Sequence, residues 1–150
     1  MQDLLTAFGV VFVAELGDKT QLAAAGFATR YQARLVAAGV VVGYVAVSSI
    51  SVLIGAVAGA AFPTRAVNIA AALVFIIVGF ATLRAGDPDA GAPKPPGSGR
   101  AAVGVAGSIA LAIVLAELGD KTMLATISLA ASGETVATWI GATAGITSSV

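Results

Sequence analysis

The chain has 150 residues, of which 58% are hydrophobic and only 11% are charged. A typical soluble domain carries about 25% charged residues, so this composition indicates an integral membrane protein. Cysteine and histidine are absent, which excludes disulfides and makes zinc and copper sites poor candidates. The formal net charge is zero, and without a basic stripe we expect no binding of nucleic acid.

Five apolar segments are expected to form membrane helices, because about 20 apolar residues suffice to cross a bilayer. In chain order they cover approximately residues 4–28, 35–61, 66–83, 102–131 and 135–150. The first segment lacks the positive leader and the clean apolar run of a signal peptide. We therefore expect it to be retained as a membrane helix, in an all-α membrane protein surrounded by lipid.

Residues 85–100 differ from the rest because proline and glycine dominate them. Such a composition is typical of a disordered linker. It divides the chain into a first repeat at 1–84, the linker at 85–100 and a second repeat at 101–150. The first repeat holds three segments, whereas the second ends during its second segment. We therefore expect a fragment of a longer chain, and a homodimer that completes the fold is the alternative.

The stretch Ala-Glu-Leu-Gly-Asp-Lys-Thr occurs twice, at residues 14–20 and 116–122. From residues 14 and 116 onward, nine of ten positions are identical at an offset of 102 residues. Each copy places two acids and a lysine inside an apolar segment. One charge at the bilayer centre costs about 2.5–3.5 kcal/mol, and charged residues there usually mark a functional site.

The motif side chains offer hard oxygen ligands, which suit Ca²⁺, Mg²⁺ or Mn²⁺. On a continuous helix, two acids three residues apart would share a face. The glycine between them would let an ion or a partner backbone come close, or would let the helix loosen there. The candidate metal ligands are Glu15, Asp18, Thr20, Gln21, Glu117, Asp120 and Thr122. The candidate charge-balancing residues are Lys19 and Lys121.

Together, the four carboxylates and two lysines of the motifs carry a formal charge of −2. One divalent cation or two protons would neutralise it, so we expect cations and protons to compete for the same carboxylates. The alternative is a structural ion pair that locks helix packing, in a membrane scaffold or assembly factor without transport activity. A channel is a third reading, distinguished by cation flux that ignores a pH gradient.

The positive residues of the connections predict the orientation. Only one of them, Arg65, falls on the side of the 62–65 turn, while the other side carries Arg30, Arg34, Arg84, Lys94 and Arg100. The positive-inside rule then puts the 31–34 and 85–100 connections in the cytoplasm and the N-terminus outside. Because each repeat makes three crossings, the two copies must traverse the membrane in opposite directions, as in inverted-repeat transporters.

The doubled Glu-Leu-Gly-Asp-Lys-Thr resembles the signature of the Gdt family, once called uncharacterised protein family 0016, in the cation/Ca²⁺ exchanger superfamily. The family pattern is Glu-x-Gly-Asp-Lys/Arg-Thr/Ser, in each of two inverted three-helix repeats. The resemblance covers the whole chain and implies this fold, with about five transmembrane helices here and the second repeat incomplete.

The same resemblance implies a divalent cation/proton antiporter, not an enzyme, in the inner membrane of a prokaryotic cell. It would export Mn²⁺ or Ca²⁺ in exchange for H⁺, without a permanent cofactor. By position, it implies that Glu15, Asp18, Glu117 and Asp120 bind the ion. The hydroxyl positions of the pattern are Thr20 and Thr122, and its basic positions are Lys19 and Lys121.

Overall fold

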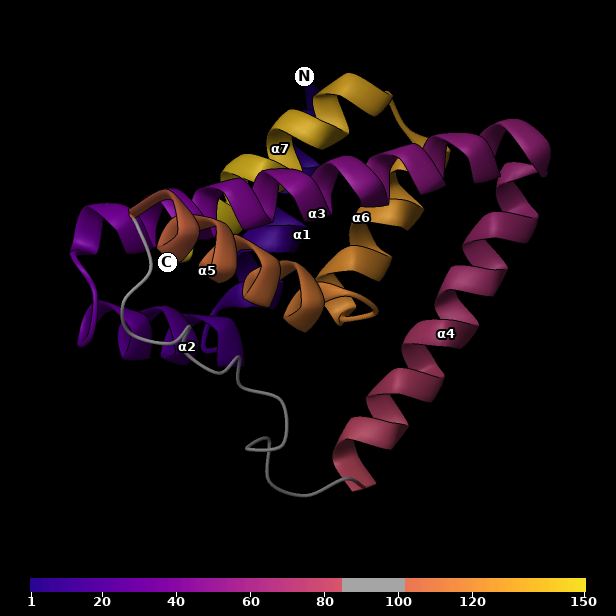
Figure 1. Cartoon of the computed structure of the whole chain (residues 1–150). Helices are drawn as coiled ribbons and strands as arrows, with labels where there is room; N and C mark the ends of the chain where they lie inside the picture. The colour runs from indigo at the N-terminus through magenta and orange to yellow at the C-terminus, as the bar shows by residue number, and fades with distance from the viewer. Residues whose placement is uncertain (85–101) are drawn as a thin grey trace.

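The computed structural model describes residues 1–84 and 102–150, and its regular structure there is entirely helical. The predicted linker at 85–100 lies outside the described residues. Within them there are seven helices (Figure 1): α1 (Gln2–Glu15), α2 (Lys19–Ala28), α3 (Ala33–Ala61), α4 (Thr64–Arg84), α5 (Ala102–Glu117), α6 (Lys121–Ser132) and α7 (Thr135–Ser148). The all-helical class predicted from the sequence is confirmed.

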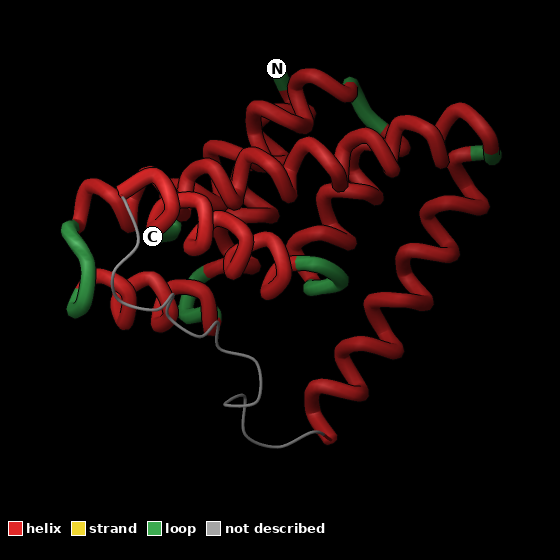
Figure 2. The backbone as a smooth tube through the Cα atoms, in the orientation of Figure 1, coloured by secondary structure: helices red, strands yellow, loops and turns green. Residues whose placement is uncertain are grey.

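Each of the five predicted segments is helical, but the prediction of one continuous helix through each motif is wrong. Residues 16–18 separate α1 from α2, and residues 118–120 separate α5 from α6, as the loops in Figure 2 show. The breaks centre on Gly17 and Gly119, whose φ angles are 77° and 82°. Glycine adopts this left-handed conformation without the steric cost of a Cβ. The axes of α5 and α6 consequently differ by 76°.

The helix boundaries repeat along the chain with the same offset of 102 residues as the motif. α1 ends at Glu15 and α5 at Glu117, and α2 begins at Lys19 and α6 at Lys121. The next helices, α3 and α7, likewise begin at residues 33 and 135. The internal repeat in the sequence is therefore also a repeat of local backbone structure.

Helices of the two halves pack closely against each other through glycines. α3 packs along α5 and α6, while α1 packs along α7. A Cβ added at Gly39 of α3 would lie 2.7 Å from a backbone oxygen of α5, and one added at Gly145 of α7 would lie 2.7 Å from a backbone oxygen of α1. Gly43 and Gly141 complete these two contacts. Small residues allow such close approach between membrane helices, so each half packs its third helix, α3 or α7, on the first helix of the other half.

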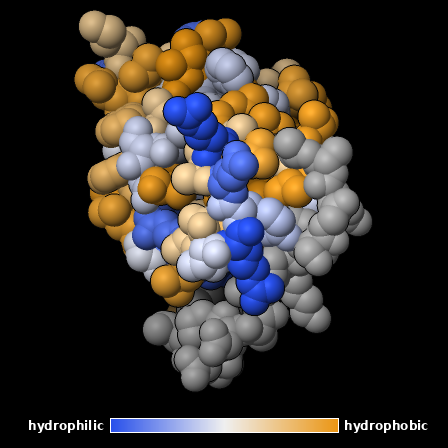
Figure 3. All heavy atoms as spheres, turned by 60° about the vertical axis from the view of Figure 1, so that its left-hand side comes forward, coloured by the Kyte–Doolittle hydropathy of each residue, from blue (hydrophilic) through white to orange (hydrophobic). Residues whose placement is uncertain are grey.

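The outer surface fits an apolar surrounding. α3 by itself is long and apolar enough to cross a membrane. Among the described residues, the bent pair α5–α6 forms a second such span when its two helices are taken together. Leu53, Val57 and Leu115 are each more than 60% exposed. Figure 3 shows a narrow band of hydrophilic residues, between hydrophobic areas, on the end where α2 leads into α3. Arg30 and Arg34 are exposed at this connection.

Candidate cation site

The two motifs meet in space, and their charged side chains pair across the contact. The Nζ of Lys121 lies 2.9 Å from Oδ1 of Asp18, and the Nζ of Lys19 lies 3.6 Å from Oδ1 of Asp120. Lys121 Nζ also lies 3.4 Å from Oδ2 of Asp120 in its own motif. The lysine of each motif therefore neutralises the aspartate of the other motif.

The helix breaks explain why these aspartates are available. Asp18 and Asp120 occupy the N-cap positions of α2 and α6, but neither makes a side-chain hydrogen bond to the helix end. Aspartate at an N-cap usually makes that bond. Here the carboxylates face the lysines instead, and the Oδ2 of Asp18 is buried without a hydrogen-bond partner in the described structure.

The two motif glutamates end α1 and α5 and are both completely buried, with 0% exposure. Glu15 accepts a hydrogen bond from the Thr122 hydroxyl, and a longer one of 3.4 Å from the Thr20 hydroxyl. Thr20 also lies beside Glu117, but neither carboxylate oxygen of Glu117 has a hydrogen-bond partner among the described residues. Because a buried carboxylate without a partner is costly, a bound cation or proton would relieve it.

Three of the predicted acids form a compact group of oxygen atoms. One carboxylate oxygen from each of Glu15, Asp18 and Asp120 lies within 4.8 Å of the other two. A cation that binds oxygens at about 2.0–2.6 Å can contact all three. Glu117 lies outside this group, although it is close enough to interact electrostatically with all three acids.

Gln21 is turned toward the backbone rather than toward the acids. Its Oε1 accepts a hydrogen bond of 3.2 Å from the Gly17 N–H, and its Nε2 donates one of 3.1 Å to the Glu15 carbonyl. Met123, the equivalent residue in the second motif, receives the Gly119 N–H on its sulfur at 3.3 Å. Both side chains therefore support the glycine break, and the Gln21 oxygen would have to leave Gly17 before it could bind an ion.

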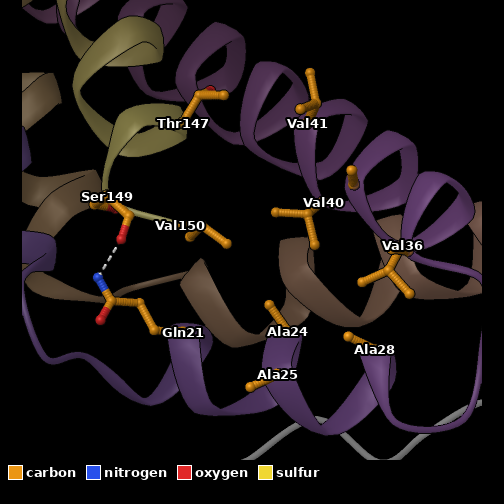
Figure 4. Close-up of a pocket in the computed structure, with 12 residues that line it drawn as sticks. Gln21, Ala24, Ala25, Ala28, Val36, Val40, Val41, Thr147, Ser149 and Val150 are labelled. Carbon is orange, nitrogen blue, oxygen red and sulfur yellow. Dashed lines mark hydrogen bonds between the residues drawn. The ribbon is translucent and has the colours of Figure 1, made fainter.

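A pocket of about 390 Å³ lies next to Gln21, between α2, α3 and the end of α7 (Figure 4). Its walls are mainly alanine and valine side chains, including Ala24 and Val40, and the Gln21 amide donates to the Ser149 carbonyl at its edge. This lining offers few ligands for a bare cation. The acidic cluster, not this pocket, is the candidate ion site.

One residue at the site was missed by sequence reasoning. Tyr44 lies on α3 and has 0% exposure. Its phenol interacts electrostatically with Glu15, Glu117 and Asp18, and the Thr20 hydroxyl lies beside it. The signal in the sequence is weak, because Tyr44 is simply the lone aromatic residue of a long apolar helix.

Comparison with known proteins agrees with the resemblance read from the doubled motif. A family model described as the divalent cation/proton antiporter GDT1 matches residues 3–90 and 105–149. The chain is 37% identical, over 166 aligned residues, to the GDT1-like protein sll0615 of Synechocystis sp., and the match covers 96% of this chain and 79% of that protein. No solved structure matches the chain. The chain belongs to the GDT1 family of membrane proteins, which are divalent cation/proton antiporters and not enzymes.

Proposed function

We propose that this antiporter exchanges Mn²⁺ or Ca²⁺ for protons at one site shared by the two motifs. The observation that supports this most directly is that the lysine of each motif pairs with the aspartate of the other motif, 102 residues away in the sequence. The shared cluster holds four acids and two lysines, with a formal charge of −2. A single divalent cation or two protons would neutralise that charge.

In this proposal, Glu15, Asp18 and Asp120 are the first ligands of the cation, since their oxygens are already grouped. The hydroxyls of Thr20 and Thr122, which now lie at Glu15, would complete the coordination as neutral oxygens. Glu117 would join as the fourth carboxylate. Gln21 stays a predicted ligand, for a state in which its oxygen has released Gly17.

The lysines would balance charge while the cation is absent. Lys19 and Lys121 each occupy an aspartate oxygen that the cation needs. Cation binding must therefore displace ammonium groups as well as protons. Such competition couples the two substrates, because the same carboxylates cannot hold the cation and the protons together.

We further propose that the two halves are inverted three-helix repeats that rock against each other to expose the site alternately. The repeated helix boundaries and the exchanged glycine contacts support a pseudo-twofold relation between the halves. Arg30 after α2 and Arg34 in the first turn of α3 are exposed, which supports a cytoplasmic position for that connection. The N-terminus would then lie outside an inner membrane, and the direction would be export. A homodimer stays a prediction.

The test is uptake of Mn²⁺ and Ca²⁺, singly and in competition, by proteoliposomes under an imposed pH gradient. We expect Glu15→Gln to lower cation transport by more than about 100-fold, since even outer-shell changes cost 10–100-fold at metal sites. The matched control is Glu134→Gln, an acid whose carboxylate caps α7 through the N–H groups of Val136 and Ala137. The control should transport normally. A Glu15→Gln protein with the wild-type rate would contradict the shared site and favour a structural role for the cluster.

A further inference from the structure

Tyr44 has a buried hydroxyl that the packing of the core does not explain. The side chain belongs to an apolar cluster with Val40, Ile109 and Ile113. Its phenol oxygen has no hydrogen-bond partner among the described residues. Burial of an unpartnered hydroxyl is unfavourable, and phenylalanine would fill the same space without that cost. A purely structural role therefore gives no reason for tyrosine here.

The phenol does lie next to groups that could use it. Thr20 is beside it, and the charges of Glu15, Glu117 and Asp18 act on it. Thr20 is itself completely buried. Its hydroxyl reaches Glu15 only at 3.4 Å, which is long for a hydrogen bond between two oxygens. The Thr20 hydrogen is thus weakly fixed in this state.

This arrangement exists in one half of the molecule only. At the offset of 102 residues, the position of Tyr44 is taken by Ile146, which is equally buried at 1% exposure. Thr122, the counterpart of Thr20, bonds closely to Glu15. A hydroxyl offers one donor and two acceptor positions, so Thr20 can accept from a phenol while it donates to a carboxylate.

We propose that Tyr44 is a positioning residue of the transport site that acts through Thr20. The inference rests on the shared site proposed above. When the cation binds, the phenol donates to the Thr20 oxygen, a bond absent from the cation-free arrangement described above. This bond turns the Thr20 hydrogen toward Glu15. Hydrogen bonds in such a chain strengthen one another. The threonine then holds Oε2 of Glu15 in place for the cation, while Thr122 holds Oε1.

The test variant is Tyr44→Phe, and Tyr31→Phe supplies the same chemical change at the other tyrosine of the chain. Mn²⁺ uptake by proteoliposomes gives KM and kcat, and thermal unfolding gives Tm. We expect Tyr44→Phe to raise KM for Mn²⁺ about 10-fold, the effect of one hydrogen bond near a charged group. Its Tm should be equal to or above that of the wild type, and Tyr31→Phe should change neither KM nor kcat.

A double-mutant cycle tests the route through Thr20. In a Thr20→Ala background, Tyr44→Phe should have no further effect on KM, because the intermediary is gone. Independent, multiplicative effects would overturn the proposal. So would a wild-type KM in Tyr44→Phe, or a large fall in its Tm without added cation, since the structure shows no hydrogen-bond partner for this hydroxyl among the described residues.

Glu15→Gln, measured in parallel, separates this inference from the proposed function. If Glu15→Gln abolishes transport and Tyr44→Phe is silent, only the role of Tyr44 is wrong. If both variants transport normally, the shared site itself is wrong and the role of Tyr44 falls with it.

Discussion

The two glutamates of the repeated motif have the same backbone setting and different surroundings. Each is the last residue of a helix and is completely buried, and two residues after each lies a glycine with a left-handed backbone conformation. Glu15 nevertheless receives two threonine hydroxyls, whereas neither oxygen of Glu117 has a hydrogen-bond partner in the described part of the chain. The identical motif therefore sets the backbone but not the surroundings of each acid, because the threonines of both copies bond to Glu15.

The residues that differ between the halves occupy equivalent positions. Gln21 supports the first glycine break where Met123 supports the second. Tyr44 stands in α3 where Ile146 stands in α7. These exchanges change polarity without changing the path of the backbone. A site built from two copies can thus hold acids that are chemically unequal, which an exchanger of cations for protons can use.

The largest expected difference concerns the glutamates themselves. Glu15→Gln replaces one of two hydrogen-bonded carboxylate oxygens by an amide nitrogen and leaves the other bond with a neutral acceptor, while Glu117→Gln alters no hydrogen bond that the structure shows. Hydrogen bonds to charged groups contribute about 1.5–3 kcal/mol. We expect Glu117→Gln to be the more stable variant by about that amount, in thermal unfolding without added cation. Equal stabilities would contradict the inequality of the two acids.

A smaller effect should be the same in both halves. Alanine at Gly17 or Gly119 would meet no atom within 4 Å, so only the left-handed φ opposes it. Each Gly→Ala change should lower the free energy of unfolding by about 1–2 kcal/mol. Gly26→Ala in α2 is the matched control, because its added Cβ also meets nothing and its φ is not left-handed. Unequal losses at residues 17 and 119 would argue against equivalent breaks.

The smallest expected difference lies in the lysines. Lys121 faces two aspartates, at 2.9 and 3.4 Å, whereas Lys19 faces one at 3.6 Å. Both side chains are about one third exposed, and such pairs contribute at most about 1 kcal/mol. We expect Lys121→Met to lower the free energy of unfolding more than Lys19→Met does. The difference between the two variants should become smaller at high salt. Chemical unfolding at low and high ionic strength measures both effects, and the reverse order would contradict the pairing.

The sequence predicted the helical segments because long apolar runs in this chain are bounded by polar turns. The bounds expected for residues 35–61 and 66–83 lie within two residues of α3 and α4. The doubled motif also singled out charged side chains that the structure brings together, since two acids and a lysine are costly in an apolar segment. What they do in transport stays a prediction.

For the motif glycine, the sequence predicted a loosening of the helix as one alternative, but not the full break that separates two helices. Glycine can end a helix in the left-handed conformation, and the aspartate after it is a favoured N-cap. Because apolar residues continue on both sides of each motif, composition predicts one long helical segment there despite those signals. The exchange of lysines between motifs and the approach of Tyr44 depend on how distant helices pack, which local patterns do not contain.

The exchanged glycine contacts also have a consequence for how the chain acquires its structure. Gly39 and Gly43 pack on α5, which is synthesised more than 60 residues later, and the glycines of α7 pack on α1 near the other end. The glycines of α3 and α7 are therefore buried only when the two halves pack together. We therefore expect α1, α2 and α3 to remain in the bilayer without their closest packing partners until the second half has been synthesised. Assembly then ends in one late step that joins the halves, and the acids of the two motifs first meet in that step.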